Sequence, residues 1–455
     1  MMITGKMSEK MIHQKEYGID SNQTHSKKNV AMILYAIYAA TVFIYEDFSV
    51  PLFVIGIFIC IIVLYLLYYH FVNKTKIMVS GTNIYILLLV MCMIANIRTI
   101  SGIRLIYWID AVLCVLMIIM ASRIHGDLMP VYRITLAFAL VFASVVIMGE
   151  IYPEMYYSLI YTHLSAESKI LVSNALVNYG VIIGGTFTFQ LYFFAAGIAI
   201  AMGYIECLKK RIIGYTLILT FLIAILCSGR RTEFLAVLVT MILTYCVSSR
   251  GKKKAKRVLL SIFICISAVI IFINSFSFFS EIDLLNRYTS SFEDLLHGND
   301  ITTGRTQLYG IAWDLFCEHP VFGIGWGGFA AYVPNTAYYF DVSNVHNNYL
   351  QLLCETGLVG TIIILFLLLG IYRNTCLHMK AVCKNAYSSE RLIEKMGTIF
   401  SFFMQTFFFI AGFMDPSLYK VLFWKWYTIA LVLELAPYYY NKNAKKNIST
   451  MVINQ

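Results

Sequence analysis

The stretch IIGYTLILTFLIAILCSGRRTEFLAVLVTMILTYCVSSRGKKKAKR occupies residues 212–257 and decides the fold class. It contains two apolar runs, 212–228 and 232–248, which are separated only by Gly-Arg-Arg. Each run approaches the roughly 20 apolar residues with which a helix crosses the hydrocarbon core of a bilayer. Continuously apolar runs favour membrane helices over barrel strands, in which polar and apolar residues alternate. The stretch therefore predicts a hairpin of membrane-spanning helices.

The rest of the chain has the same character. Of its 455 residues, 59% are hydrophobic and 13% are charged, and this charged share is about half that of an ordinary soluble domain. These values exclude a soluble globular enzyme and also a disordered chain. We predict an all-α polytopic integral membrane protein with about twelve transmembrane helices, at residues 30–45, 50–72, 82–97, 105–122, 132–149, 179–206, 212–228, 232–248, 258–279, 357–373, 395–413 and 421–438.

Basic residues orient these helices, because short cytoplasmic loops carry an excess of Lys and Arg. The run RGKKKAKR at 250–257 follows the second helix of the hairpin and indicates a cytoplasmic loop. With the N-terminus in the cytoplasm, the outer segments hold few basic residues, namely Arg98, Arg104, Lys169, Arg230, Arg231, Arg287, Arg305 and Lys420. The net charge of +10 therefore reflects membrane topology and gives no support to nucleic-acid binding.

Two outer segments stand out by their length, at roughly residues 150–178 and 280–356. Residues 280–356 contain no apolar run long enough to span, and loops held by a rigid scaffold often carry binding and catalytic groups. The expected organisation is a cytoplasmic N-tail (1–29), nine transmembrane helices (30–279), a large extracytoplasmic catalytic loop (280–356), three more transmembrane helices (357–438) and a cytoplasmic C-tail (439–455).

The loop begins with an amphipathic pattern. In TTGRTQLYGIAWDLFCEHP at 302–320, apolar residues recur at helical spacing. Arg305 lies one turn before the first of them, Leu308, at the edge of the apolar face. Two interpretations of Arg305 are open: its stem is buried at the membrane interface, or its guanidinium binds an anion near the headgroups.

Two further segments complete the loop. PVFGIGWGGF at 320–329 contains closely spaced glycines, which permit either a phosphate cradle or a tight turn; the turn is favoured because the lysine of the nucleotide-binding pattern is missing. In VHNNYLQLLCETGLVG at 345–360, Asn347 or Asn348 can cap a helix that ends at Gly357. His346 precedes this helix and is the loop's best-suited general base, because histidine titrates near neutral pH; a purely structural role stays open.

Read together, these pieces resemble the Wzy O-antigen and capsule polymerases and the related O-antigen ligases. In that family an outer loop carries an arginine, a tryptophan, a Pro-x-x-Gly-x-Gly turn, and a His-Asn pair followed by Leu, Glu and Gly. The matching positions here are Arg305, Trp313, Pro320, Gly323, Gly325, His346, Asn347, Leu350, Glu355, Gly357 and Gly360. A second family element resembles SGRRTEFLAVL at 228–238, where Arg231 followed by Thr232 fits best and Arg230 is an additional arginine.

The resemblance implies a metal-independent, membrane-embedded glycosyltransferase of the GT-C-like class, without a cofactor. It would act at the outer face of a bacterial plasma membrane, with both termini cytoplasmic. Its reaction would transfer a growing glycan from undecaprenyl diphosphate onto a lipid-linked oligosaccharide repeat unit, in O-antigen, capsule or exopolysaccharide synthesis. The implied partners are the bilayer, the lipid-linked oligosaccharide, and a chain-length regulator and a flippase of the same pathway.

This chemistry assigns roles to the residues. Attack of a hydroxyl on an anomeric carbon needs a base for the hydroxyl proton and positive charge for the departing diphosphate, and arginine binds phosphate oxygens bidentately. We expect the catalytic residues to be His346, Arg305, Arg231 and Glu355, with Glu355 as an orienting partner or a competing base. The diphosphate would bind to Arg230, Arg231 and Arg305. The loop would be shaped by Trp313, Gly323, Gly325 and Asn347.

Three alternatives stay open. An O-antigen ligase shares the motif and differs in its acceptor, and a flippase for lipid-linked oligosaccharides would also have many spans. A metal-dependent transferase could use the acidic pairs Glu46–Asp47 or Glu281–Asp283.

Ionisable residues within the predicted spans are further functional candidates, because their burial is costly. Glu233 is expected to pair with Arg230 or Arg231, and Lys425 to extend to the outer interface. Asp110 and Glu434 are the other candidates of this kind.

Overall fold

The computed structural model describes residues 30, 32–39, 52–73, 80–97, 105–121, 128–166, 168–170, 172–173, 190–248, 305–333, 344–384 and 389–453. Every regular element within these ranges is a helix. Residues 32–39 of the first predicted span are helical. The ninth predicted span, the start of the large outer loop, and the acidic pairs Glu46–Asp47 and Glu281–Asp283 lie outside the described residues.

The helices follow the apolar runs of the sequence. The elements are α4 (Leu52–Asn73), α5 (Gly81–Ala95), α6 (Leu105–Met120), α7 (Met129–Ile151), α8 (Pro153–Leu159), η2 (Tyr161–His163), α10 (Gln190–Glu206), α11 (Arg211–Cys227), α12 (Arg231–Ser248), α15 (Arg305–Glu318), α16 (Phe329–Tyr332), α17 (Asn348–Lys384), α18 (Ser389–Ala411), η4 (Ser417–Tyr419) and α19 (Val421–Ile453). The predicted all-helical class is confirmed, and so is the amphipathic helix of the outer loop, which is α15.

Two helices differ from their predicted ranges. The short helix predicted before Gly357 and the span predicted after it form the single element α17, but Gly357 has φ +63° and ψ −172°, so the helical path is broken there. Helix α19 continues beyond the predicted end of its span and contains Pro437.

Length and composition identify candidate membrane spans among these helices. Met129–Ile151 and Asn348–Cys383 are long and apolar enough to cross a bilayer. Shorter apolar helices occupy Gly56–Tyr68, Gly81–Ala95, Tyr107–Met120, Leu191–Glu206, Arg211–Cys227 and Thr232–Ser248. The number of twelve spans stays a prediction.

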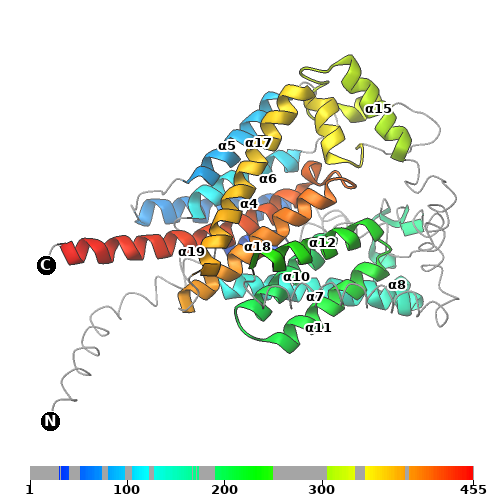
Figure 1. Ribbon diagram of the computed structural model, residues 1–455. Helices are drawn as coiled ribbons and strands as arrows, with labels where there is room; N and C mark the ends of the chain where they lie inside the picture. The colour runs from blue at the N-terminus through cyan, green and yellow to red at the C-terminus, as the bar shows by residue number, and fades with distance from the viewer. Residues whose placement is uncertain are drawn as a thin grey trace, which may run out of the picture.

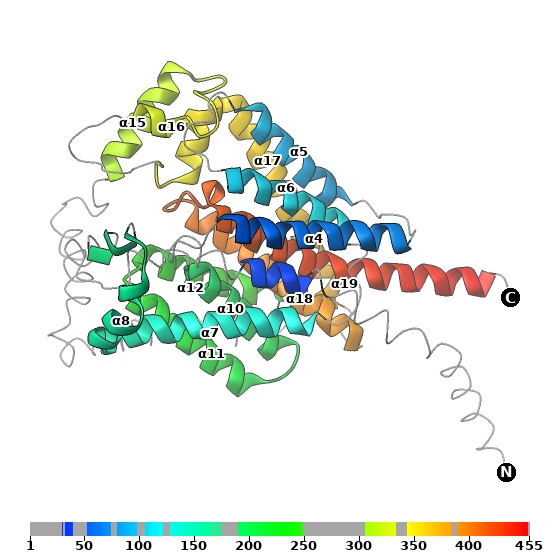
Figure 2. The same cartoon turned by 180° about the vertical axis from the view of Figure 1, so that it is seen from behind.

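Helix α18 lies at the centre of the bundle and packs against α10, α12, α17 and α19 (Figures 1 and 2). Helices α10 and α19 are buried around most of their circumference between Leu191 and Ile205 and between Leu422 and Ala436. The peripheral helices instead expose large apolar side chains, including Leu64 and Phe71 of α4, Met91 of α5 and Phe366 of α17. Such extended apolar surface is suited to contact with lipid.

Charged residues inside the bundle form specific contacts. Lys425 and Asp110 are fully buried and pair at 3.2 Å, while the Tyr38 hydroxyl donates to the other oxygen of Asp110 at 2.9 Å. The expected extension of Lys425 to the interface is therefore wrong: its carboxylate partner on α6 keeps the ammonium inside. The predicted pairing of Glu233 is confirmed with Arg230, at 3.4 Å.

Glu434 belongs to a second buried cluster, which joins three helices. His378 of α17 contacts Glu434 of α19 through Nδ1 at 3.1 Å and Glu394 of α18 through Nε2 at 2.9 Å. The Thr375 hydroxyl also donates to Glu434, at 2.8 Å. These contacts give Glu434 a role in holding α17, α18 and α19 together.

The buried pair on α6 and α19 predicts a stability effect. We expect Lys425→Met to lower the free energy of unfolding by about 3–5 kcal/mol, because Asp110 is left buried without its cation; Asp110→Leu combined with Lys425→Met should recover most of the loss. Thermal unfolding of the purified protein in detergent measures the difference. Independent, additive effects of the two substitutions would contradict the pairing.

Candidate active site

The N-terminal end of α17 is joined to the glycine-rich turn by backbone hydrogen bonds. The N–H groups of Ile324 and Gly325 donate to the carbonyls of Cys354 and Glu355 at 3.0 and 2.7 Å, just before the break in α17. Beyond the break, the N–H groups of Leu358 and Val359 donate to the carbonyls of Pro320 and Val321 at 2.8 and 3.2 Å. We call these four bonds the backbone clasp. It satisfies polar groups that the break removes from the helix ladder.

Two glycines make the clasp geometrically feasible. Gly323 and Gly357 both have positive φ (+62° and +63°). A Cβ at Gly323 would lie 2.4 Å from the carbonyl of Glu355, and one at Gly357 would lie 2.4 Å from the carbonyl of Val321. The two backbones thus cross in direct contact, and only glycine combines this approach with this conformation. The tight turn predicted from the sequence is present, and its partner is α17.

Glu355 supports the turn from inside. Its carboxylate is fully buried and accepts the N–H of Gly327 at 2.7 Å and that of Phe329 at 3.2 Å. It also accepts the Gln351 amide at 3.2 Å, and the Gln351 carbonyl oxygen in turn accepts the N–H of Val345 at 3.2 Å. Both carboxylate oxygens are engaged, which favours the orienting role over that of a base, and the Gln351 side chain links Glu355 to the backbone of Val345, the residue before His346.

His346 occupies a sharp turn at the mouth of α17. Its φ is +59°, and among the described non-glycine residues only Lys209 shares a positive φ. The following residue, Asn347, caps the helix, since its Oδ1 accepts the N–H groups of Tyr349 and Leu350 at 3.0 Å each. A left-handed conformation in a residue other than glycine costs about 1–3 kcal/mol and is concentrated at functional sites. The surrounding bonds hold His346 in this conformation.

The environment of His346 is strongly positive. Burial lowers the pKa of its imidazole, and the nearby charges of Arg305 and Lys420 lower it further, to about 4; Arg230 acts in the same direction and Asp415 opposes it. His346 is therefore neutral at physiological pH and able to accept a proton. The sequence led us to expect a pKa near neutrality, and the structure corrects this: burial of the imidazole is the main cause of the lower pKa, and three nearby cations add to it.

These cations come from distant parts of the chain. Arg305 is the first residue of α15, and its Nη1 donates to the carbonyl of Met414 at 3.1 Å. Arg230 immediately precedes α12 and pairs with Glu233. Arg231 begins α12, but its side chain lies outside the described residues. Of the two neighbouring arginines, Arg230 is the one with a described charge effect on His346.

The turn between α18 and α19 brings the third cation. Asn348 fixes this turn: its N–H donates to the carbonyl of Gly412 at 2.7 Å, its Nδ2 to the Ser417 hydroxyl at 2.8 Å, and its Oδ1 accepts the N–H of Leu418 at 3.1 Å. Asp415 and Lys420 lie on this turn and pair with each other. We assigned neither residue from the sequence; the available signal was two opposite charges in a short outer connection.

The two tryptophans of the loop differ in burial. Trp313 is 52% exposed, whereas Leu308, Ala312 and Leu315 form the buried face of α15. The role of Trp313 in shaping the loop stays a prediction. Trp326 is fully buried; its ring stacks on Tyr419 with centroids 4.6 Å apart, and its backbone N–H donates to the carbonyl of Asn96 at 2.7 Å. Trp326 thus connects the turn to α5 and to η4.

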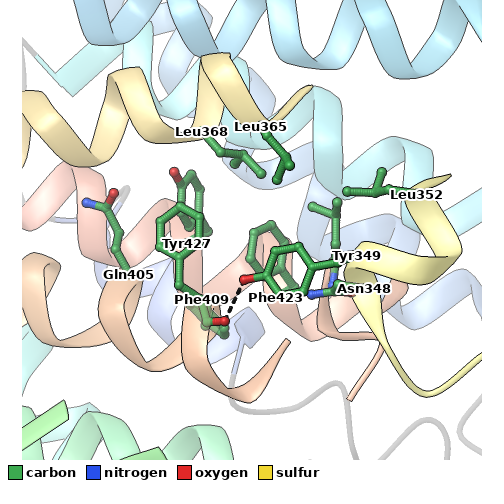
Figure 3. A pocket seen from close by; sticks show the side chains of 11 residues that line it. Asn348, Tyr349, Leu352, Leu365, Leu368, Gln405, Phe409, Phe423 and Tyr427 are labelled. Atoms are coloured by element: carbon green, nitrogen blue, oxygen red, sulfur yellow. Dashed lines mark hydrogen bonds between the residues drawn. The ribbon is translucent and has the colours of Figure 1, made fainter. Parts of the chain in front are cut away.

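A cavity lies between α17, α18 and α19 (Figure 3). It is small, with a volume of about 30 Å³. Asn348 and Tyr349 line it at the N-terminal end of α17, and the Tyr349 hydroxyl donates to the carbonyl of Phe409 at 2.6 Å. The remaining lining is apolar or aromatic apart from Gln405, and none of the cations around His346 belongs to it.

Residues 215–365 match the family model described as O-antigen ligase, Wzy_C. This range contains Arg230, Arg305, His346 and Glu355 as well as the backbone clasp. Over this part of the chain, the sequence is similar to the O-antigen ligase domain family, which covers both Wzy polymerases and WaaL ligases. Enzymes of this family are membrane glycosyltransferases that act in polysaccharide synthesis on lipid-linked glycans. Among curated proteins none matches the chain.

The clasp predicts which glycines tolerate a side chain. We expect Gly323→Ala and Gly357→Ala to destabilise the protein by more than about 2 kcal/mol each, because each adds backbone strain and a steric clash. Gly310→Ala is the matched control on α15, where a Cβ meets nothing within 4 Å. Unfolding temperatures in detergent provide the measurement. A destabilisation by Gly310→Ala as large as that by Gly323→Ala would be inconsistent with the clasp.

Proposed function

We propose that the protein is a polysaccharide polymerase, which transfers the growing glycan from undecaprenyl diphosphate onto a lipid-linked oligosaccharide repeat unit at the outer face of the plasma membrane. The observation that carries this proposal is the neutral His346 held in a left-handed turn among the charges of Arg305, Arg230 and Lys420. A base beside several cations is what glycosyl transfer from a diphosphate requires.

In the proposed reaction, an acceptor hydroxyl attacks the anomeric carbon of the glycan. The new glycosidic C–O bond forms while the C–O bond to the diphosphate breaks, and its electron pair leaves with undecaprenyl diphosphate. His346 takes the hydroxyl proton and later releases it to water. Arg305 and Arg230 bind the phosphate oxygens, whose charge grows as the bond breaks. The proposed mechanism requires no metal ion.

The basicity of His346 is coupled to the substrate in this mechanism. In the free site the cations hold its pKa at about 4, where an imidazole is a weak base. A bound diphosphate brings negative charge among the same cations and offsets their field, so the pKa of His346 rises. The base thus becomes stronger when the donor substrate is present.

The arrangement of the bundle is compatible with an outer location of this site. Helices α8 and α15 lie at one end of the bundle, whereas the C-terminal end of α19 lies at the opposite end in both views (Figures 1 and 2). If the C-terminus is cytoplasmic, α15 and His346 face the exterior. We retain this topology, with both termini cytoplasmic and residues 280–356 as the catalytic loop.

The runner-up is an O-antigen ligase, which the name of the matching family favours. It would use the same base and cations but a different acceptor for the glycan. Two hosts separate the proposals: one lacks its own polymerase and the other lacks its own ligase. A restored ladder of glycan lengths in the first host supports the polymerase, and a restored transfer to the final acceptor only in the second supports the ligase.

The ladder also tests the site residues. We expect His346→Ala, Arg305→Ala and Arg230→Ala each to reduce polymer formation by about 100-fold or more, since each removes a group that acts in the transition state. Lys169→Ala is the matched control, a basic residue of the other large outer segment. Full-length polymer from both Arg305→Ala and His346→Ala would refute the assignment.

Polymerisation in EDTA should continue unchanged, since the proposed mechanism requires no metal ion. Loss of activity in EDTA would favour a metal-dependent transferase.

A second prediction concerns pH. We expect kcat/KM to stay level as the pH falls from 7 and to drop only near pH 4. Near that pH, His346 of the free protein becomes protonated and can no longer act as the base. The acid limb of kcat should lie at higher pH, since the bound diphosphate raises the pKa of His346. Arg305→Gln should move the acid limb of kcat/KM to higher pH, because the variant lacks one of the positive charges that lower the pKa of His346. An unchanged limb in that variant would show that Arg305 does not act on His346.

A further inference from the structure

In the reaction proposed above, Lys420 contributes its charge near His346 but has no assigned contact with the substrate. It follows η4 and pairs with Asp415, whose other oxygen accepts the hydroxyl of Tyr192 from α10 at 3.0 Å. Burial alone would raise the pKa of Asp415, but the Lys420 ammonium, with Arg230 near it, lowers that pKa below its usual value. Asp415 is thus an ionised carboxylate, and its ion pair with Lys420 holds the ammonium at the edge of the site.

The charge of Lys420 reaches His346. Among the charges that lower the pKa of this histidine, Lys420 comes directly after Arg305 and before Arg230. Arg305 and Lys420 are also joined by one short turn, because the Arg305 guanidinium donates to the carbonyl of Met414, the neighbour of Asp415. An anion seated between Arg305 and His346 would therefore lie within the field of Lys420.

The side chain of Lys420 can change partners. Its ammonium ends a flexible stem and carries rotatable donors, whereas a guanidinium fixes its donors in one plane. If Lys420 leaves, Asp415 keeps the hydrogen bond from Tyr192, so the carboxylate is not left without a donor. A phosphate oxygen could therefore replace the Asp415 carboxylate oxygen as the partner of the Lys420 ammonium.

We propose that Lys420 is a third diphosphate-binding cation, which Asp415 holds beside the site until a phosphate of the donor substrate takes its place. This inference rests on the proposed function, since it concerns the diphosphate of the same donor. The Asp415 carboxylate competes with the diphosphate for Lys420 and so sets the affinity of the site. Product release is aided in the same way, because Asp415 recaptures Lys420 as undecaprenyl diphosphate leaves.

The test is the binding of undecaprenyl diphosphate and of inorganic pyrophosphate to the purified full chain in detergent. We expect Lys420→Gln to weaken the binding of both probes by about 10- to 100-fold, the effect of losing one charged hydrogen bond. Asp415→Asn should keep or strengthen binding, because Lys420 loses its competitor. Lys169→Gln serves as the matched control for loss of a basic residue.

Two reference measurements make the outcome decisive. The unfolding temperature shows whether each variant is folded, and Arg305→Gln reports on the proposed function itself. If Arg305→Gln weakens binding while Lys420→Gln does not, the Lys420 inference is overturned and the proposed function stands. If neither variant weakens binding, the proposed function falls as well. If Asp415→Asn weakens binding as much as Lys420→Gln, the ion pair is a structural contact and the exchange is excluded.

Discussion

The backbone clasp is the contact on which the outer end of this molecule depends. A helix that breaks at Gly357 has carbonyl and N–H groups without intrahelical partners, and the turn at 320–325 supplies them. In return, the turn acquires a fixed position, and α15 packs its apolar face against the same assembly. Glu355 completes the arrangement from within, since it binds the N–H groups of Gly327 and Phe329. A main-chain interaction thus positions the helix that begins with Arg305.

A second set of contacts gathers the charges. Asn348 holds the turn between α18 and α19, while Asn347 caps α17 beside it. The segment from Asn347 to Glu355 therefore organises the loop on one side and the α18–α19 turn on the other. Because His346 lies at the start of this segment, cations from three separate parts of the chain act on it. The proposed chemistry depends on that convergence, because burial and the nearby cations together keep His346 neutral.

Much of this was predictable from the sequence. Apolar runs located the helices because burial in lipid or in a bundle demands continuous hydrophobicity, and the spacing of glycines located the turn. Arg305 and His346 were predicted as site residues from their type, their position and the resemblance of the loop to the Wzy family, and their roles stay a proposal. The features that could not be predicted depend on partners remote in sequence. Lys425 is held inside the bundle by its ion pair with Asp110, and the Trp326 ring stacks on Tyr419. The charge of Lys420 acts on His346 because the fold brings the two residues near each other. The unexpectedly low pKa of His346 also arises from the fold, which buries the imidazole and brings three cations near it.

The crossing of Gly323 and Gly357 limits how this part of the protein can move. Two backbones in contact, with four hydrogen bonds between them, cannot slide past each other as side chains can. A displacement of the turn at 320–325 must therefore carry the adjoining segment of α17 with it. A change confined to one of the two segments would break the hydrogen bonds of the clasp.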